Sequence, residues 1–193
     1  MPRAYRVDNA GKWHHVVNRG AAGQPIFMDD QDRRTFLSEI EYAASKSAQI
    51  VHCYCLMGNH FHILVESQDG QLSLFPKLLS GRYTRIFNTR HRRDGALFRG
   101  RALTVGIADN DHLLRATRYI HVNPVVAGLC QTATEWPWSS AAAYFGDAQE
   151  QPWLTTKTIR EMVQRDGRRE AYAAFISDGI DRATAQFYAN VGV

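Results

Sequence analysis

The pattern of hydrophobic and polar positions along the chain predicts a series of strands and helices. Runs in which apolar and polar residues alternate indicate strands, and runs with an apolar residue at every third or fourth position indicate amphipathic helices. Aspartates, which are preferred N-cap residues, precede the first and third helical runs. The predicted elements, in order, are a strand at Trp13–Asn18, a helix from Asp29 or Asp30 to about Lys46, strands at Ile50–Met57 and His60–Glu66, a helix from Gln71 to about Thr89, a strand at Ala102–Ile107 and a helix from Asp109 or Asp111 to Asn123.

The order of these elements, β-α-β-β-α-β followed by a helix, is typical of one fold class. We expect an α+β protein with the ferredoxin-like split βαβ arrangement, an antiparallel sheet with its helices mostly on one face. Gly58-Asn59 alone separates the middle two strands, and this pair tolerates the positive φ of a tight hairpin turn. Pro124 is expected to end the third helix at Asn123, because a proline disfavours helical backbone at the residue before it.

The region after the third helix differs in composition from the rest. Residues 135–153 are rich in tryptophan, proline and small residues, which suggests a boundary. Two short helices, Thr155–Gln164 and Arg168–Ser177, are predicted beyond it. We therefore expect a catalytic domain at residues 1–130 and, at residues 131–193, a C-terminal segment with a small helical tail.

Length and composition fit an ordinary globular domain. The chain has 193 residues, of which 45% are hydrophobic, and it contains no run of the roughly 18 apolar residues that a membrane helix needs. The first residues lack the apolar stretch of a secretory signal. The three cysteines are an odd number, which does not suggest a framework of disulfide bonds. These features predict a reduced, cytoplasmic protein with no membrane partner.

The distribution of charge is more informative than its sum. The net charge is only +4, but residues 82–101 hold seven arginines against a single aspartate. A basic stretch of this kind suits a polyanionic partner, although a solvated arginine-rich loop would look the same. The aromatic residues Tyr83, Phe87 and Phe98 lie among the arginines and suit either stacking on unpaired bases or packing in the core. The arginines are Arg82, Arg85, Arg90, Arg92, Arg93, Arg99 and Arg101.

The first candidate for chemistry is the histidine pair in the predicted strand His60–Glu66. His60 and His62 lie on one face of the strand, and the apolar residues between them lie on the other. Two imidazoles about 7 Å apart at Cα can bind one divalent metal ion. A pair of histidines packed against the sheet without a metal is the competing interpretation.

The second candidate lies at the end of the predicted third helix. Tyr119 and Asn123 are four residues apart and share one helix face. A phenol has a pKa of about 10 and is a poor nucleophile at neutral pH, so it needs a metal or a polarised electrophile. An amide oxygen beside it can complete the ligand set of that metal. Alternatively, Tyr119 packs at the helix end and Asn123 only terminates the helix.

Taken together, these blocks resemble the single-tyrosine HUH (IS200-like) transposases, specifically the REP-associated tyrosine transposases. MGNHFHILVE is similar to the family's His-hydrophobic-His block, and RYIHVNPVVAGL is similar to its tyrosine helix. Three further stretches match in the same order, and the likeness extends from about residue 5 to 145. These stretches are NRGAAGQPIFMDDQDRRTFL, SGRYTRIFNTRHRRDGALFRGR and WPWSS.

The resemblance implies an endonuclease and strand transferase that acts on single-stranded or hairpin DNA. By analogy, Tyr119 is the nucleophile that forms a 5′-phosphotyrosine linkage. His60, His62 and Asn123 hold a divalent ion, Mg²⁺ or Mn²⁺. The seven arginines and Tyr83 would contact the DNA. The departures from the family pattern are Gly58, where proline is usual, His121 at an often acidic position and Val126 in place of an arginine.

Two other functions remain open at this point. A replication-initiator nickase would use the same chemistry, and a hairpin-binding regulator would keep the basic surface without catalysis. The intact set of two histidines, tyrosine and asparagine argues against a pure binder. Because relatives are both dimers and monomers, the sequence leaves the oligomeric state, and the chain that supplies the tyrosine, undecided.

Overall fold

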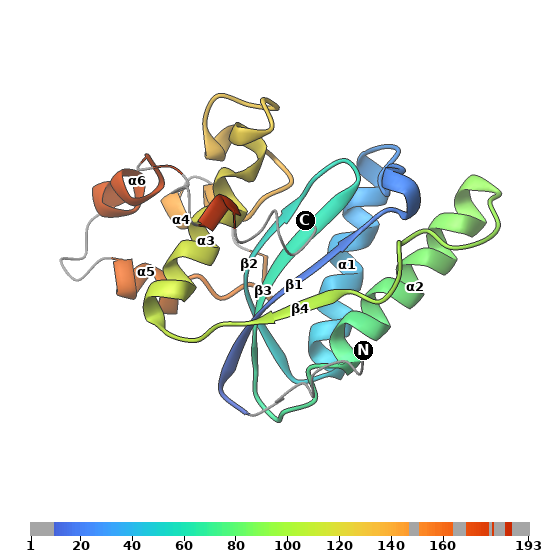
Figure 1. The fold of residues 1–193 in the computed structure, drawn as a ribbon, viewed down its shortest axis with the longest axis horizontal. Coiled ribbons are helices and arrows are strands. Elements are labelled where there is room, and N and C mark those ends of the chain that lie inside the picture. Colours follow the sequence, from blue (N-terminus) through green and yellow to red (C-terminus); the bar gives the residue numbers. More distant parts are fainter. Residues whose placement is uncertain (1–9, 147–150, 164–168, 178, 180–183, 187–193) are drawn as a thin grey trace.

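The computed structural model describes residues 10–146, 151–163, 169–177, 179 and 184–186. The element order is the predicted β-α-β-β-α-β followed by helices (Figure 1). The strands are β1 (Lys12–Arg19), β2 (Gln49–Leu56), β3 (His60–Ser67) and β4 (Leu103–Gly106). The helices are α1 (Asp30–Lys46), α2 (Leu74–His91), α3 (Asn110–Val126), α4 (Ala141–Phe145), α5 (Lys157–Val163) and α6 (Arg169–Ser177), with short 3₁₀ turns at Ala21–Gly23 and Ala133–Glu135.

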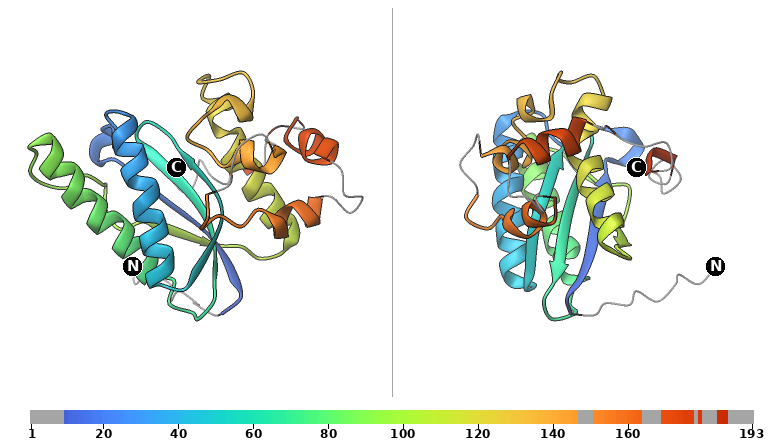
Figure 2. Two further views of the ribbon diagram at one scale, coloured as in Figure 1. Left: turned by 180° about the vertical axis from the view of Figure 1, so that it is seen from behind. Right: turned by 90° about the vertical axis from the view of Figure 1, so that its left-hand side faces the viewer.

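The four strands form one antiparallel sheet in the order β2-β3-β1-β4, which confirms the predicted split βαβ arrangement. Helices cover both faces, so the expectation that they lie mostly on one face is wrong. Helices α1 and α2 cover one face, and α3 crosses the other with α4–α6 beside it (Figures 1 and 2). The sheet is therefore the middle layer of three.

Each face of the sheet has its own hydrophobic core, because side chains alternate along each strand. On the α1–α2 side, Phe61, Ile63 and Val65 of β3 pack into a cluster with the helices. On the α3 side, Leu64 packs with β2 thiols and with the inward residues of α3, α5 and α6. The face that carries His60 and His62 is thus walled by α3 and is not open to solvent along its length.

Local backbone geometry corrects two details. The β2–β3 hairpin forms as predicted, but neither Gly58 nor Asn59 has a positive φ. Helix α3 does not stop at Asn123: it runs to Val126 with Pro124 inside it and ends before Gly128, whose φ is +69°. A proline here removes a single helical hydrogen bond, and burial of its ring against the neighbouring core offsets that loss.

The segment after residue 130 covers the edge of the sheet. Strand β2 is an edge strand, and its outward backbone groups pair with this segment: the Leu56 amide donates to the Trp138 carbonyl and the Ser140 amide to that of Tyr54. The Thr155 amide donates to the Val51 carbonyl further along. Covering an edge in this way blocks pairing with another chain. Gln164 and Arg168, the inner ends of the two predicted tail helices, lie outside the described residues.

A helix that spans a membrane needs about 20 consecutive, mostly apolar residues. Among the helices in the described part of the chain, none is both long and apolar enough to cross a bilayer.

Phe36 on α1 is expected to be among the most stabilising residues of the core. Its fully buried ring contacts the rings of Phe27, Phe61 and Tyr83 at centroid distances of 4.8–5.3 Å. Replacing it by alanine leaves a cavity and should lower the free energy of unfolding by about 3–5 kcal/mol. Urea unfolding measures this loss, and Leu129→Ala at an exposed position should change stability by less than about 1 kcal/mol.

Candidate active site

The histidine pair lies where strand β3 faces helix α3. His62 is fully buried, His60 is half-buried, and the two rings lie at right angles with centroids 5.0 Å apart. Phe61 between them points into the opposite core. The alternation read from the sequence therefore places both imidazoles on one face, as predicted.

Helix α3 brings Tyr119 and Asn123 to the same place. The Tyr119 ring meets the His62 ring edge-on, with centroids 5.3 Å apart. Asn123 Nδ2 lies 3.3 Å from His62 Nε2, and the Asn123 side chain also acts on the pKa of His60, which it raises, and of Tyr119, which it lowers, in each case against the larger effect of burial. The four residues that the sequence singled out therefore meet within one chain, around the Asn123 amide. Their chemical roles remain predictions.

Burial sets the protonation of these groups. It lowers the pKa of His60 to about 4, with the nearby Arg19 charge adding to the effect, and it lowers that of His62 well below its usual value. Both rings are thus neutral at neutral pH, the form in which imidazole binds metals. Burial also raises the pKa of Tyr119, so the phenol keeps its proton at neutral pH until something in the site removes it.

The donor set fits a divalent cation. In the described part of the chain no cluster of three or more His, Cys, Asp or Glu residues could hold a metal, so an ion here would rest on His60, His62 and the Asn123 amide. The 3.3 Å between His62 and Asn123 is close to the spacing of about 3 Å between adjacent ligands of an octahedral ion. A half-turn of the Asn123 amide about its last side-chain bond would bring its oxygen, the ligand atom, toward the ion. Two imidazoles favour Mn²⁺ over Mg²⁺.

His15 is a functional candidate that the sequence left undecided. Only one of His14 and His15 can face the site, and the structure shows that it is His15. Its Nε2 lies 3.0 Å from His62 Nδ1, and it is fully buried. This contact occupies Nδ1 of His62 and so leaves Nε2 as the nitrogen that faces Asn123.

Arg19 is a candidate that sequence reasoning missed. It ends β1 directly opposite His60 in the antiparallel register, so the two side chains share a face. Its positive charge adds to the effect of burial, which is the larger cause, in lowering the pKa of His60. A strand-end arginine before a glycine has no distinguishing sequence signal. Only the pairing of β1 with β3 reveals its position.

The basic stretch divides into two groups. Arg82 pairs with Glu39 at 2.5 Å and lies over the Tyr42 ring, Arg90 pairs with Asp29 and Asp32, and Arg93 bonds to Gln24. Such arginines stabilise α2 and the loop after it. The exposed members outside this paired group, whose side chains reach solvent, are Arg85, Arg92, Arg99 and Arg101.

Tyr83 does not belong to a DNA surface. Its side chain is 1% exposed, and its hydroxyl donates to the Ile26 carbonyl at 2.5 Å. The prediction that it contacts DNA is therefore wrong: a ring with both faces inside the core cannot stack on a base.

Comparison with solved structures supports the fold. The structure of a REP-associated tyrosine transposase bound to a REP hairpin matches with a TM-score of 0.65 and 15% identity, over 78% of this chain and 93% of that one. Weaker matches are a provisionally assigned transposase from Deinococcus radiodurans (TM-score 0.44, 12% identity, 67% of this chain and 96% of that one) and tRNA(His) guanylyltransferase from Saccharomyces cerevisiae (0.46, 10%, 94% and 84%). No protein-family model and no curated protein matches the sequence. The chain thus has the fold of the first of these structures.

Proposed function

We propose that this protein is a metal-dependent DNA transposase, an endonuclease and strand transferase that cuts single-stranded DNA at or near a hairpin with Tyr119 as nucleophile. The observation that carries the proposal is the convergence on His62: Asn123 Nδ2 lies 3.3 Å from its Nε2, and the rings of His60 and Tyr119 lie 5.0 and 5.3 Å from its ring. A phenol, two neutral imidazoles and an amide at one point are the groups that a metal-assisted phosphoryl transfer needs.

The proposed reaction exchanges one phosphoester for another. Tyr119 Oη attacks the scissile phosphorus, the bond from phosphorus to the 3′ oxygen breaks, and the phenolic proton ends on that oxygen. The products are a 5′-phosphotyrosine and a free 3′-hydroxyl. Because the number of phosphoester bonds is unchanged, a 3′-hydroxyl can reverse the step and join strands without ATP.

Each side chain of the site has a separate task in this reaction. His60, His62 and Asn123 would hold the cation, which when bound polarises a phosphate oxygen and offsets the charge that develops on it. His15 fixes the orientation of His62 through their 3.0 Å contact. Asn123, one turn further along α3, lowers the pKa of the Tyr119 hydroxyl against the effect of burial and would keep that hydroxyl beside the cation site.

The proposed DNA partner follows from charge and from the comparison. The structural neighbour was solved with a REP hairpin, which supports hairpin DNA as the partner of this chain. We assign the phosphate contacts to the exposed arginines of residues 82–101 and expect affinity to fall steeply with salt. The paired arginines Arg82 and Arg90 contribute less, since carboxylates already neutralise them.

Arg19 should contact the phosphate at the cut site. Arg19→Ala is expected to lower the rate of covalent cleavage about 100-fold, because a cation beside His60 stabilises the charge on the transferring phosphoryl group. Arg19→Lys should keep more of the rate. Arg34→Ala, which removes an exposed arginine from α1 on the far side of the sheet, is the matched control. Equal cleavage rates for the Arg19→Ala and Arg34→Ala variants would show that Arg19 does not contribute to the active site.

The test of the proposal is a covalent-adduct assay. Hairpin oligonucleotides with randomised loops and single-stranded flanks are incubated with the full chain in Mn²⁺, Mg²⁺ or EDTA, and products are separated on a denaturing gel. We expect a protein–DNA adduct with either metal and none in EDTA. Sequencing the trapped DNA then gives the cut site.

Two other outcomes of the assay would contradict the proposal. A native mobility shift without any adduct in either metal would indicate a hairpin-binding regulator. An adduct that never joins its DNA to an added strand with a 3′-hydroxyl would indicate a nickase of the replication-initiator kind.

A further inference from the structure

His121 lies on the side of α3 that faces away from the histidine pair. It follows Tyr119 by two residues and precedes Asn123 by two, so it points about 200° around the helix from each of them. Its imidazole is fully buried. Nδ1 lies 2.5 Å from the Tyr172 hydroxyl on α6, and Nε2 lies 2.8 Å from the Ser140 hydroxyl just before α4.

Both partners of His121 are themselves anchored. Ser140 Oγ accepts from the Tyr54 amide of β2 at 2.9 Å, and the Ser140 amide donates to the Tyr54 carbonyl at 3.0 Å. The Tyr172 ring stacks on Tyr144 at 4.9 Å and meets Phe145 edge-on at 5.3 Å. His121 therefore ties α3 to the sheet edge on one side and to α6 on the other.

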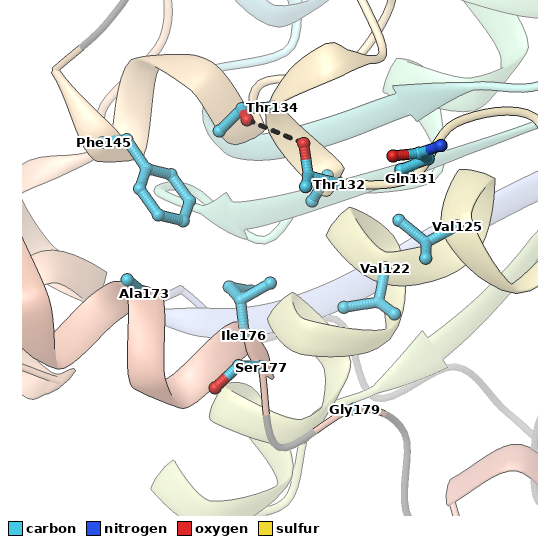
Figure 3. Close-up of a pocket in the computed structure, with 11 residues that line it drawn as sticks. Val122, Val125, Gln131, Thr132, Thr134, Phe145, Ala173, Ile176, Ser177 and Gly179 are labelled. Atoms are coloured by element: carbon cyan, nitrogen blue, oxygen red, sulfur yellow. Dashed lines mark hydrogen bonds between the residues drawn. The ribbon is translucent and has the colours of Figure 1, made fainter.

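The apolar packing around this part of α3 borders a cavity. A pocket of about 460 Å³ separates Val122 and Val125 of α3 from Phe145 and from Ile176 of α6 (Figure 3). The side chains labelled in Figure 3 line this space from α3, from the segment after it and from α6. Beside this pocket, the hydrogen bonds of His121 add directional polar contacts that restrict the rotation of α3.

We propose that His121, Tyr172 and Ser140 position the nucleophile helix, so that α6 and the residues just before α4 are a working part of the active site and not an appendage. The inference rests on the proposed function. A side-chain tip lies about 6 Å from the helix axis, so a 10° rotation of α3 moves it by about 1 Å. A displacement of that size can cost about 100-fold in rate. Tyr119 and Asn123 would move together.

The test compares two matched tyrosine variants. Tyr172→Phe removes the hydroxyl that bonds to His121, and Tyr144→Phe removes an equally buried hydroxyl that bonds to the His52 carbonyl of β2 at 2.7 Å. Both keep their stacked rings. We expect similar losses of thermal stability, but a 10- to 100-fold slower adduct formation at saturating DNA in Tyr172→Phe alone. The dissociation constant for uncleaved hairpin in EDTA should change less than about threefold in either.

A second measurement makes the test independent of activity. Hydrogen–deuterium exchange of the amides in residues 119–126 should quicken in metal-free Tyr172→Phe and stay near wild type in Tyr144→Phe. If the wild type forms no adduct but exchange separates the variants, the positioning role stands and the proposed function fails. Equal exchange in the two variants would overturn the positioning role, and so would equal adduct rates in the two variants when the wild type forms an adduct. His121→Gln should recover part of the rate lost in His121→Leu, because its amide restores a polar partner.

Discussion

Phenylalanine in place of Tyr119 is expected to abolish the covalent adduct with hairpin DNA, lowering its rate of formation by more than about 1000-fold. The substitution removes only Oη and keeps the ring that meets His62 edge-on. The fold, the metal affinity and the affinity for uncleaved hairpin should therefore remain near wild type. A denaturing gel measures the adduct, and a mobility shift in EDTA measures the hairpin affinity.

Tyr83→Phe is the matched control for this result. It removes another buried phenolic hydroxyl, the one that donates to the Ile26 carbonyl, from the opposite side of the sheet. We expect it to lower the free energy of unfolding by about 1 kcal/mol and to leave adduct formation unchanged. If the adduct persisted in Tyr119→Phe and was lost in Tyr83→Phe, the nucleophile would be Tyr83 and the assignment of Tyr119 would be wrong.

Local sequence pattern predicted the parts of the site that lie on one element. The alternation along β3 places His60 and His62 on one face, and the spacing of four residues puts Tyr119 and Asn123 on one face of α3. The order of elements predicted the sheet. These features depend on periodicity within a segment, and periodicity is what a sequence shows directly.

Features that depend on pairing between distant segments could not be predicted from the sequence. The register of β1 against β3 puts Arg19 opposite His60 and brings His15 to His62, and nothing local to β1 specifies that register. The contacts of His121 likewise join distant parts of the sequence: Tyr172 lies 51 positions away from it and Ser140 lies 19 positions away. A buried histidine looks the same in sequence whether it orients a catalytic group or fills space.

The arginine-rich stretch shows the same limit for charge. Its composition indicated a polyanion-binding surface or a solvated loop, but Arg82 and Arg90 instead form ion pairs within the fold. They pair with acidic side chains of α1, whose sequence lies more than 40 residues earlier. Acidic residues 29–41 and basic residues 82–101 are thus partly complementary within the fold, and only the exposed arginines remain for DNA.

Removing the half-buried imidazole of His60 should have the second largest effect on catalysis. His60→Ala takes one of three proposed ligands from the cation and is expected to slow adduct formation by about 100- to 1000-fold at micromolar Mn²⁺. His60 is more accessible than His62, so its loss leaves a smaller cavity and the fold should persist. Titration of Mn²⁺ binding by electron paramagnetic resonance should show a matching fall in affinity.

The response of His60→Ala to added metal separates ligand loss from nucleophile loss. Because a weakened site still fills by mass action, millimolar Mn²⁺ should restore part of the His60→Ala rate but none of the Tyr119→Phe rate. His14→Ala, which removes the β1 imidazole that points to the opposite face, should keep the wild-type dependence on Mn²⁺. If His60→Ala formed adduct at the wild-type rate in micromolar Mn²⁺, His60 would not be a ligand, and the cation would have to rest on His62 and Asn123 alone.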